Sequence, residues 1–151
     1  MPHMSESKPF QFSLRAAIVM TLVAGVLLGS IIGVVSFFDN IKRAEFNLHA
    51  MRETLQIVEQ HIEKHPGEWP RSWEELDETA ASSGLKWRFP LNEMKERVEI
   101  DFNARLEDLA RQDDETFKAI RPIGPCYVHA EQVRFLLRTI RADIAARTQK
   151  K

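Results

Sequence analysis

The sequence contains very little cysteine, and its single Cys126 excludes an internal disulfide framework. An excess of either charge is also missing, because residues 39–151 carry 19 Lys and Arg residues against 21 Asp and Glu residues. A near-neutral chain has no general electrostatic attraction to nucleic acid, so we expect no nucleic-acid partner. Glycine-rich phosphate loops, serine nucleophile elbows and internal repeats are absent too. The sequence therefore predicts a protein that is not an enzyme and takes no cofactor or small-molecule substrate.

Charge is entirely missing from residues 16–38, a run of 23 residues bracketed by Arg15 and Asp39. A bilayer core of about 30 Å needs about 20 residues of apolar helix, so this run is long enough to cross a membrane. The apolar region of a cleaved signal peptide is shorter, and it ends at small residues rather than at bulky ones such as Phe37 and Phe38. We predict an N-terminal tail over residues 1–15 and an uncleaved transmembrane helix over residues 16–38.

Small residues recur at every fourth position of this run, which places them in one stripe along a helix. They are Ala17, Thr21, Gly25, Gly29 and Gly33. Such a stripe lets the backbone of a second membrane helix approach closely, although glycine is also generally common in membrane helices. We expect the stripe to pack against other transmembrane helices, from a second copy or from subunits of a heterologous complex.

The helical pattern continues beyond the apolar run, as a seam of apolar residues at alternating spacings of three and four. The seam consists of Ile41, Ala44, Leu48, Met51, Leu55, Val58 and Ile62. No helix breaker lies within residues 16–64, so we predict one continuous helix of 49 residues, about 74 Å long, in which residues 39–65 form a stalk.

The seam has two interpretations: a coiled coil with a second copy, or packing on the protein's own soluble domain. In a coiled coil, charged e positions are usually matched by charged g positions. Here the e positions are Glu45, Arg52 and Glu59, whereas the g positions are Asn47, Thr54 and His61. The uncharged g positions favour packing on the protein's own domain.

Residues 66–151 are predicted to form a small soluble α+β head. Pro66 and Gly67 end the stalk, and Ser72 stands three residues before Glu75 in the pattern of a capping box, which opens a short helix that closes at Gly84. Short helical turns are expected within residues 105–119, and a C-terminal amphipathic helix over residues 129–147.

Period-two alternation appears twice in the head and predicts two half-buried strands. The apolar positions are Leu85, Trp87 and Phe89 in the first strand, and Val98, Ile100 and Phe102 in the second. With residues 91–96 as the connection, the two strands are expected to form an antiparallel hairpin. The predicted fold class is thus a membrane-anchored α+β protein with one long N-terminal helix.

Three residues suggest chemistry, and each has a simpler explanation. His61 and His65 stand at i and i+4, a spacing that can hold zinc, but the order His-x-Glu-x-His lacks the glutamate placement of a metalloprotease. Two exposed histidines near a helix end are the simpler reading. Cys126 lies three residues from His129 without an organised acid, which is typical of a small packing residue. We therefore predict no catalytic, cofactor or metal-binding residues.

The head offers several candidates for contact with a partner. Aromatic candidates are Trp69 and Trp73, and loop 121–127 is a further one. Arg134, Arg138 and Arg141 follow the polar side of the last helix and could touch an acidic partner or anionic headgroups. The alternatives are core packing for the tryptophans and a solvated face for the arginines.

Two segments together resemble type IV pilins and type II secretion pseudopilins. They are Phe12-Ser13-Leu14, followed at once by the apolar run and an unbroken stalk, and the corner Trp69-Pro70-Arg71-Ser72-Trp73-Glu74-Glu75-Leu76. Phe-Ser-Leu-Arg before a glycine-bearing span is also similar to short single-pass proteins of planctomycete-type bacteria. The pilin glycine before the cleavage point and the glutamate at the fifth mature position have no counterpart here.

The resemblance implies a single-pass protein of the bacterial inner membrane, with a cytoplasmic N-terminus and a periplasmic head. Charge alone is close to a tie and slightly favours the opposite orientation, since Lys8 and Arg15 on one side stand against Lys42, Arg43 and Arg52 on the other. The expected function is a non-catalytic structural or assembly component of a membrane complex. The alternatives are an accessory subunit of a large, possibly energy-converting complex and, more remotely, a metal-binding or enzymatic head.

Overall fold

The computed structural model describes residues 14–126 and 130–149, and it divides the chain into an N-terminal unit, Met1–Asp39, and a C-terminal unit, Asn40–Lys151. The structure is mixed, with five helices and one two-stranded antiparallel sheet in the part described. The predicted α+β class is confirmed at this level. The predicted tail, including Phe12 and Ser13 of the pilin-like motif, lies outside the described residues.

Helix α1, Leu14–Lys64, is the first and longest element and has 51 residues. The prediction of one unbroken helix through residues 16–64 is confirmed. His65, Pro66 and Gly67 end it as expected, and Gly67 adopts a φ of +89° that other residues rarely take. A Cβ added at this glycine would lie 2.8 Å from the Nη1 atom of Arg147, the flexible end of a side chain that can shift, so the positive φ is the reason that the turn requires glycine.

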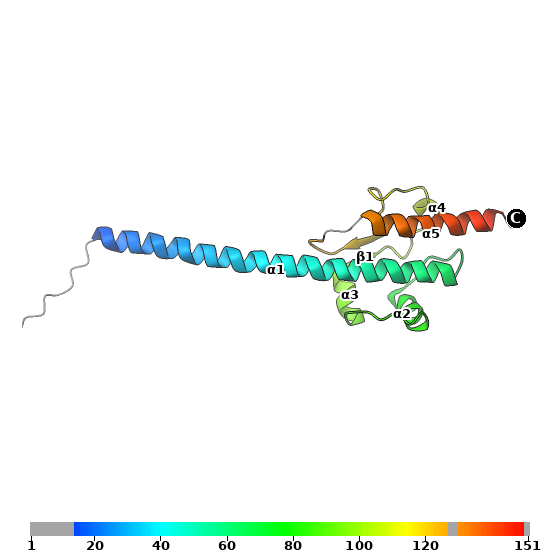
Figure 1. Ribbon diagram of the computed structural model, residues 1–151, viewed down its shortest axis with the longest axis horizontal. Coiled ribbons are helices and arrows are strands. Elements are labelled where there is room, and N and C mark those ends of the chain that lie inside the picture. Colours follow the sequence, from blue (N-terminus) through cyan, green and yellow to red (C-terminus); the bar gives the residue numbers. More distant parts are fainter. Residues whose placement is uncertain (1–13, 127–129, 150–151) are drawn as a thin grey trace, which may run out of the picture. The chain divides into compact units, whose positions relative to one another are not determined.

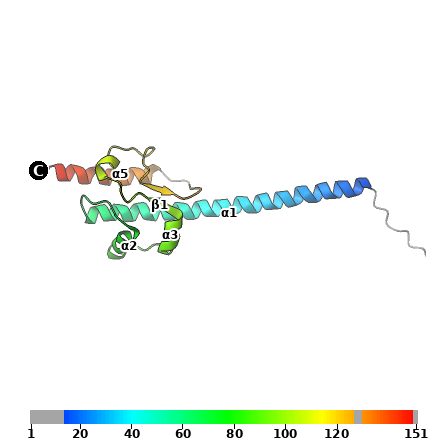
Figure 2. The ribbon, with the colours of Figure 1, turned by 180° about the vertical axis from the view of Figure 1, so that it is seen from behind.

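The second half of α1 is the central element of the C-terminal unit. In both views of the ribbon it runs between helix α5, Ala130–Thr148, on one side and helices α2, Trp73–Ser82, and α3, Leu91–Arg97, on the other (Figures 1 and 2). The predicted C-terminal helix is therefore confirmed, and its residues Val133, Leu136, Leu137 and Ile140 are buried. The position of His129 lies outside the described residues.

Helix α2 begins with the predicted cap. The Ser72 hydroxyl accepts a hydrogen bond from the Glu75 backbone N–H at 3.3 Å. The Glu75 carboxylate reaches back to the N–H of Arg71 at 2.7 Å, one residue before the position that a standard capping box uses. Gly84 follows the helix with a φ of +71°, as expected for a glycine closing a helix.

The predicted hairpin is wrong. Strand β1, Val98–Ile100, pairs with β2, Ile120–Pro122, and not with residues 85–89. The register sets Glu99 opposite Arg121, whose guanidinium donates two hydrogen bonds to the Glu99 carboxylate at 2.8 and 2.9 Å. Helix α4, Leu106–Leu109, lies between the two strands in sequence. The predicted connection 91–96 is instead helix α3, which buries Met94.

Residues 85–89 keep the alternation that suggested a strand but have no strand partner. Leu85, Trp87 and Phe89 are half-buried against the core, while Lys86 and Arg88 are exposed. The backbone N–H of Arg88 donates a hydrogen bond to the Glu53 carboxylate on α1 at 2.8 Å, so a side chain accepts this bond where a neighbouring strand would otherwise do so. Alternation reports which face of a segment is buried, and it does not identify the backbone that pairs with it.

The cap of α2 yields a stability prediction. Ser72→Ala removes the acceptor for an orphan N–H and should lower the free energy of unfolding of the C-terminal unit by about 1 kcal/mol. The matched control is Ser83→Ala at the other end of α2, because the buried Ser83 hydroxyl has no hydrogen-bond partner in the described structure. Urea unfolding of the detergent-solubilised chain, followed by tryptophan fluorescence, measures both. An equal effect of the two substitutions would contradict the assigned cap.

Candidate functional site

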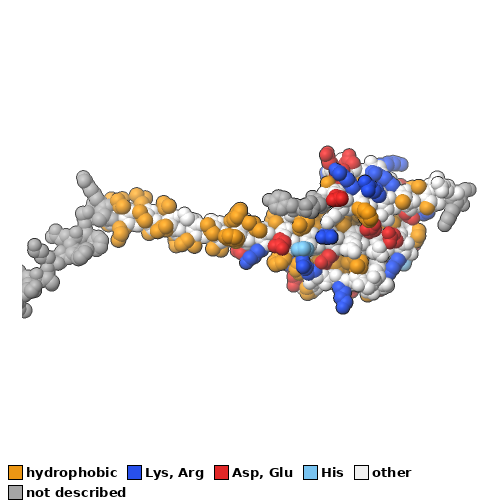
Figure 3. Space-filling model, in the orientation of Figure 1, with side chains coloured by type: hydrophobic (Ala, Val, Ile, Leu, Met, Phe, Trp, Pro, Cys, Tyr) orange, Lys and Arg blue, Asp and Glu red, His pale blue; other side chains and the backbone are white. Residues whose placement is uncertain are grey.

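The first candidate surface is the apolar part of α1 in the N-terminal unit. Every residue from 17 to 38 is exposed, and space-filling shows hydrophobic side chains along this part of the helix (Figure 3). The small-residue stripe lies here without cover, since an added Cβ at Gly25, Gly29 or Gly33 would meet nothing within 4 Å. Ala17 and Thr21 of the stripe are exposed as well.

The polar groups within this stretch are satisfied inside the helix. The Thr21 hydroxyl donates to the Ala17 carbonyl at 2.9 Å, and the Ser30 hydroxyl donates to the Val26 carbonyl at 2.8 Å. A polar group in hydrocarbon must find its partner within the protein, and helix backbone carbonyls supply one here. The described stretch is thus compatible with lipid surroundings, in length and in polarity.

The second candidate surface is the stalk seam in the C-terminal unit. Of the seam residues, Ala44, Met51, Leu55, Val58 and Ile62 are buried, Leu48 is half-buried and Ile41 is exposed. Of these, Met51, Leu55, Val58 and Ile62 belong to the core cluster together with residues of α2, α3 and α5. Beyond the seam, Ile57 is also buried and widens the covered face.

Sequence reasoning missed the importance of the three uncharged g positions. Asn47, Thr54 and His61 are all buried, at heptad spacing, on the covered side of α1. Thr54 bonds to its own helix at the Ala50 carbonyl, at 2.8 Å. The side chains of Asn47 and His61 instead contact groups outside α1, as described below. Their signal was present in the sequence as three neutral polar residues seven apart, where a coiled coil would place charge.

Asn47 fastens the loop that follows β2. Its side-chain amide donates to the carbonyls of Ile123 at 3.0 Å and Pro125 at 3.1 Å. The N–H of Ile123 in turn binds the Arg97 carbonyl at 2.7 Å, which extends the β1–β2 ladder by one bond. These two hydrogen bonds attach the candidate loop 121–127 to α1. The loop is described as far as Cys126, and Tyr127 lies outside the described residues.

His61 joins α1 to α2. Its Nδ1 lies 3.0 Å from the Thr79 hydroxyl, its ring lies 4.8 Å from that of His65, and its Nε2 is buried without a hydrogen-bond partner. Burial lowers the pKa of His61, and the neighbouring His65 and Arg71 lower it further, while Glu75 and Glu68 oppose them. The folded protein therefore favours the neutral imidazole.

Among the residues described, no group of three His, Cys, Asp or Glu side chains is arranged to hold a metal ion. The cleft at His61 and His65 measures about 340 Å³ and is bordered by Glu68, Glu75 and Glu78. Cys126 is half-buried, and burial raises the pKa of its thiol, which works against a reactive thiolate.

The tryptophan candidates contribute to packing. Trp69 is buried, and its indole N–H donates to the Asp101 carbonyl at 2.8 Å. Trp73 is half-buried between Trp87 and Phe102, with ring centroids 6.1 Å from each. Trp69 therefore offers no surface to a partner, and Trp73 offers only part of its ring.

Two of the three arginine candidates on α5 hold a neighbouring loop. Arg134 pairs with Asp114 at 2.8 Å, and this hydrogen bond lowers the pKa of that carboxyl. Arg141 donates to the carbonyls of Ala110 at 2.9 Å and Gln112 at 2.6 Å. Arg138 is exposed, and no ion pair is recorded for it within the described residues. The arginines thus serve mainly to attach α4 and its following loop to α5.

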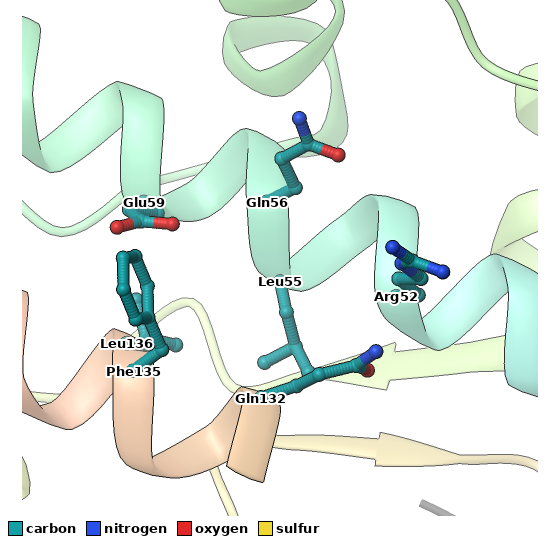
Figure 4. Close-up of a pocket in the computed structure, with 7 residues that line it drawn as sticks. All are labelled: Arg52, Leu55, Gln56, Glu59, Gln132, Phe135 and Leu136. Atoms are coloured by element: carbon teal, nitrogen blue, oxygen red, sulfur yellow. The ribbon is translucent and has the colours of Figure 1, made fainter. Parts of the chain in front are cut away.

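A groove between α1 and α5 is a further concave feature of the described structure (Figure 4). It measures about 310 Å³ and is lined by Arg52, Leu55, Gln56, Glu59, Gln132, Phe135 and Leu136. Burial raises the pKa of Glu59, while the Thr139 hydroxyl, which donates to it at 3.0 Å, partly offsets this. The lining holds one carboxylate, Glu59, and one guanidinium, Arg52.

Comparison of the chain with protein-family models, with curated proteins and with solved structures finds no match in any of the three. The assignment of the candidate surfaces is therefore based on the sequence and geometry of this chain alone.

The Asn47 contacts yield a second prediction. Asn47→Ala removes two hydrogen bonds and should lower the free energy of unfolding by about 1 kcal/mol. Asn47→Asp should lower it by about 2 to 3 kcal/mol, because the new carboxylate would be buried against the two carbonyl oxygens of Ile123 and Pro125. Hydrogen exchange at the Ile123 amide should accelerate in both variants. Unchanged protection of that amide in the aspartate variant would contradict the assigned role.

His61 yields a prediction of pH dependence. Because its pKa lies below the ordinary value of 6.5 in the folded state, the unfolded chain takes up a proton first as the pH falls. Stability of the C-terminal unit should be constant above about pH 7 and decline as the pH falls below 6.5 toward 5. Urea midpoints across this range measure the effect. His61→Gln should remove most of the decline, and the control His49→Gln should retain it; a decline that persists in His61→Gln would assign it elsewhere.

Proposed function

We propose that this chain is a single-pass membrane protein that acts as a non-catalytic structural or assembly component of a bacterial membrane complex. The observation that carries the proposal is the uncovered, charge-free part of α1. Fourteen large hydrophobic side chains between residues 18 and 38 are more than half exposed. Burying each is worth about 1.5 to 3 kcal/mol, so their sum exceeds the stability of a typical domain, about 5 to 15 kcal/mol. A helix of this kind requires lipid or other helices around it.

The proposed working surface of the span is its small-residue stripe. Lipid tails are as apolar as leucine, so membrane helices associate through close packing rather than through a hydrophobic driving force. Gly25, Gly29 and Gly33 have no contact from their own chain, which leaves the stripe available to another helix. The proposed partner is therefore a second transmembrane helix.

The covered stalk seam supports a role as accessory subunit more than a role as a repeating filament subunit. In the C-terminal unit, the side of α1 opposite the core presents polar residues such as Arg52, Gln56 and Glu63. No apolar heptad face is left there, within the described residues, for the stalk of a second copy. The pilin-like organisation is retained in this proposal as a long helix followed by an α+β unit, with that unit outside the cytoplasm.

The span proposal is tested by one substitution and a matched control. Gly29→Ile places a bulky side chain on the stripe, so we expect the complex extracted from native membranes in mild detergent to lose its partner, with a fall in association of about tenfold for a loss of about 1.4 kcal/mol. Ser30→Ile makes a similar change at the next position, about 100° around the helix, and should leave the complex intact.

Native mass of the purified assemblies is the measurement. A wild-type protein that is monomeric at all concentrations, with nothing copurifying, would refute the proposed function. Equal loss of assembly in Gly29→Ile and Ser30→Ile would refute the stripe as the packing face. A partner of a different mass would favour the accessory role, and multiples of the chain's own mass would favour self-assembly.

A further inference from the structure

The C-terminal unit exposes four large hydrophobic side chains among its described residues, and three of them lie around the first turns of α1 in this unit. Ile41, Phe46 and Ile123 are 46%, 41% and 46% exposed, and the fourth, Phe135, lies on α5. Scattered single apolar residues are ordinary on a protein surface, whereas several gathered at one level of the structure indicate a contact.

Ile123 and Phe46 are linked through Arg97. The N–H of Ile123 binds the Arg97 carbonyl at 2.7 Å, and the Arg97 guanidinium carbon lies 5.5 Å from the centre of the Phe46 ring. Phe46 in turn packs edge-on against Phe89, with ring centroids 5.7 Å apart. The loop at Ile123 therefore lies beside the first turns of α1 in the C-terminal unit.

The loop is held in place while its apolar side chain is exposed. The two bonds from Asn47 fix the carbonyls of Ile123 and Pro125, and Gly124 between them has a φ of +95°. Ordering a loop costs conformational entropy, about 1 to 2 kcal/mol per residue for the backbone. The loop is ordered despite this cost, and the side chain of Ile123 is nevertheless exposed, as expected for a residue that contacts another surface.

The three side chains lie on different sides of α1. At 100° per residue, Phe46 is about 140° around the helix from Ile41, and Asn47, which carries the Ile123 loop, is a further 100° on. A groove on a protein partner would meet one side of the helix. A planar surface lying across the helix axis meets all of them, and a bilayer is such a surface.

The sequence position and the charges also fit a lipid surface. Ile41 and Phe46 follow the last apolar residue, Phe38, by three and eight residues, which is at most about 12 Å along a helix. Lys42 and Arg43 are exposed in the same turns, with no ion pair recorded for either in the described structure, whereas Glu45 faces His49 at 3.9 Å. Apolar and aromatic side chains with nearby basic groups are what the membrane interface favours.

We propose that Ile41, Phe46 and loop residues 123–126 form a surface, here called the collar, that enters the bilayer interface, with Lys42 and Arg43 against lipid phosphates. The collar rests on the proposed function, because it requires that residues 16–38 span the membrane. Its effect would be to fix the C-terminal unit against the bilayer surface.

The test uses the full chain reconstituted in vesicles of phosphatidylcholine with a minor fraction of phosphatidylglycerol. A single cysteine is introduced by Ile123→Cys, Phe135→Cys or Val26→Cys in a Cys126→Ser background and labelled with an environment-sensitive fluorophore. Lipids that carry a quencher near the headgroup or deep in the acyl chain then report depth. Phe135→Cys is the matched control, since Phe135 is at least as exposed as Ile123 but lies outside the collar.

We expect the headgroup-level quencher to reduce the fluorescence of the label at 123 about twofold more than that of the label at 135, because quenching requires entry into the interfacial layer. Equal quenching at 123 and 135, with the label at 26 quenched by the deep lipid, would overturn the collar and leave the span intact. An unquenched label at 26 would overturn the proposed span and the collar with it. Disulfide formation between two chains at position 123, without quenching, would overturn the collar and assign the surface to a second copy.

Discussion

The structure depends on one constraint: helix α1, 51 residues long, satisfies the backbone hydrogen bonds of its interior within itself, while its side chains face two different surroundings. In the N-terminal unit the side chains are apolar and uncovered. In the C-terminal unit the same helix becomes the centre of a packed core that includes Ala50, Met51 and Val58. A helix is the one single-segment structure that can enter lipid with no unpaired backbone group, and it continues into water without a change of geometry. Helices α2, α3 and α5 contribute residues to this core, α4 packs on α5, and β1 pairs with β2.

Packing alone would leave the neighbours of α1 free to slide along it, since an apolar seam has little positional preference. The buried polar residues at heptad spacing remove that freedom. Asn47 binds carbonyls that only the loop after β2 supplies, and His61 meets a hydroxyl that only α2 supplies. A buried polar group that loses its partner costs about 1 to 3 kcal/mol, which is enough to select one register among nearly equal apolar ones. Asn47 and His61 thus specify the arrangement, whereas Thr54 bonds within α1 and the seam supplies the burial.

The limits of reading this sequence follow from the same physics. The long helix, the cap at Ser72 and the amphipathic helix α5 were predictable because each depends on local spacing or on one local hydrogen bond. The partner of β1 was not predictable, because β2 is three residues long, contains Pro122 and has only Ile120 buried. Helix α3 was not predicted, because it lies between two alternating segments and its residues were assigned to the connection between them. The positions of Asn47 and of the arginines on α5 depend on loops that are remote in sequence, and no local pattern encodes those contacts.

The same division governs what can be said of function. A stripe of small residues and a charge-free run are local patterns, and they are the basis of the proposed membrane span. The C-terminal unit differs, because its most conspicuous residues in sequence, Trp69, Arg134 and Arg141, are used to hold the fold together. Apart from charged and polar side chains, this unit leaves exposed part of Trp73 and the apolar side chains of Ile41, Phe46, Ile123 and Phe135. Because Trp69, Arg134 and Arg141 are engaged within the unit, the surface that it offers to a partner follows from the folded structure and not from residue type in the sequence.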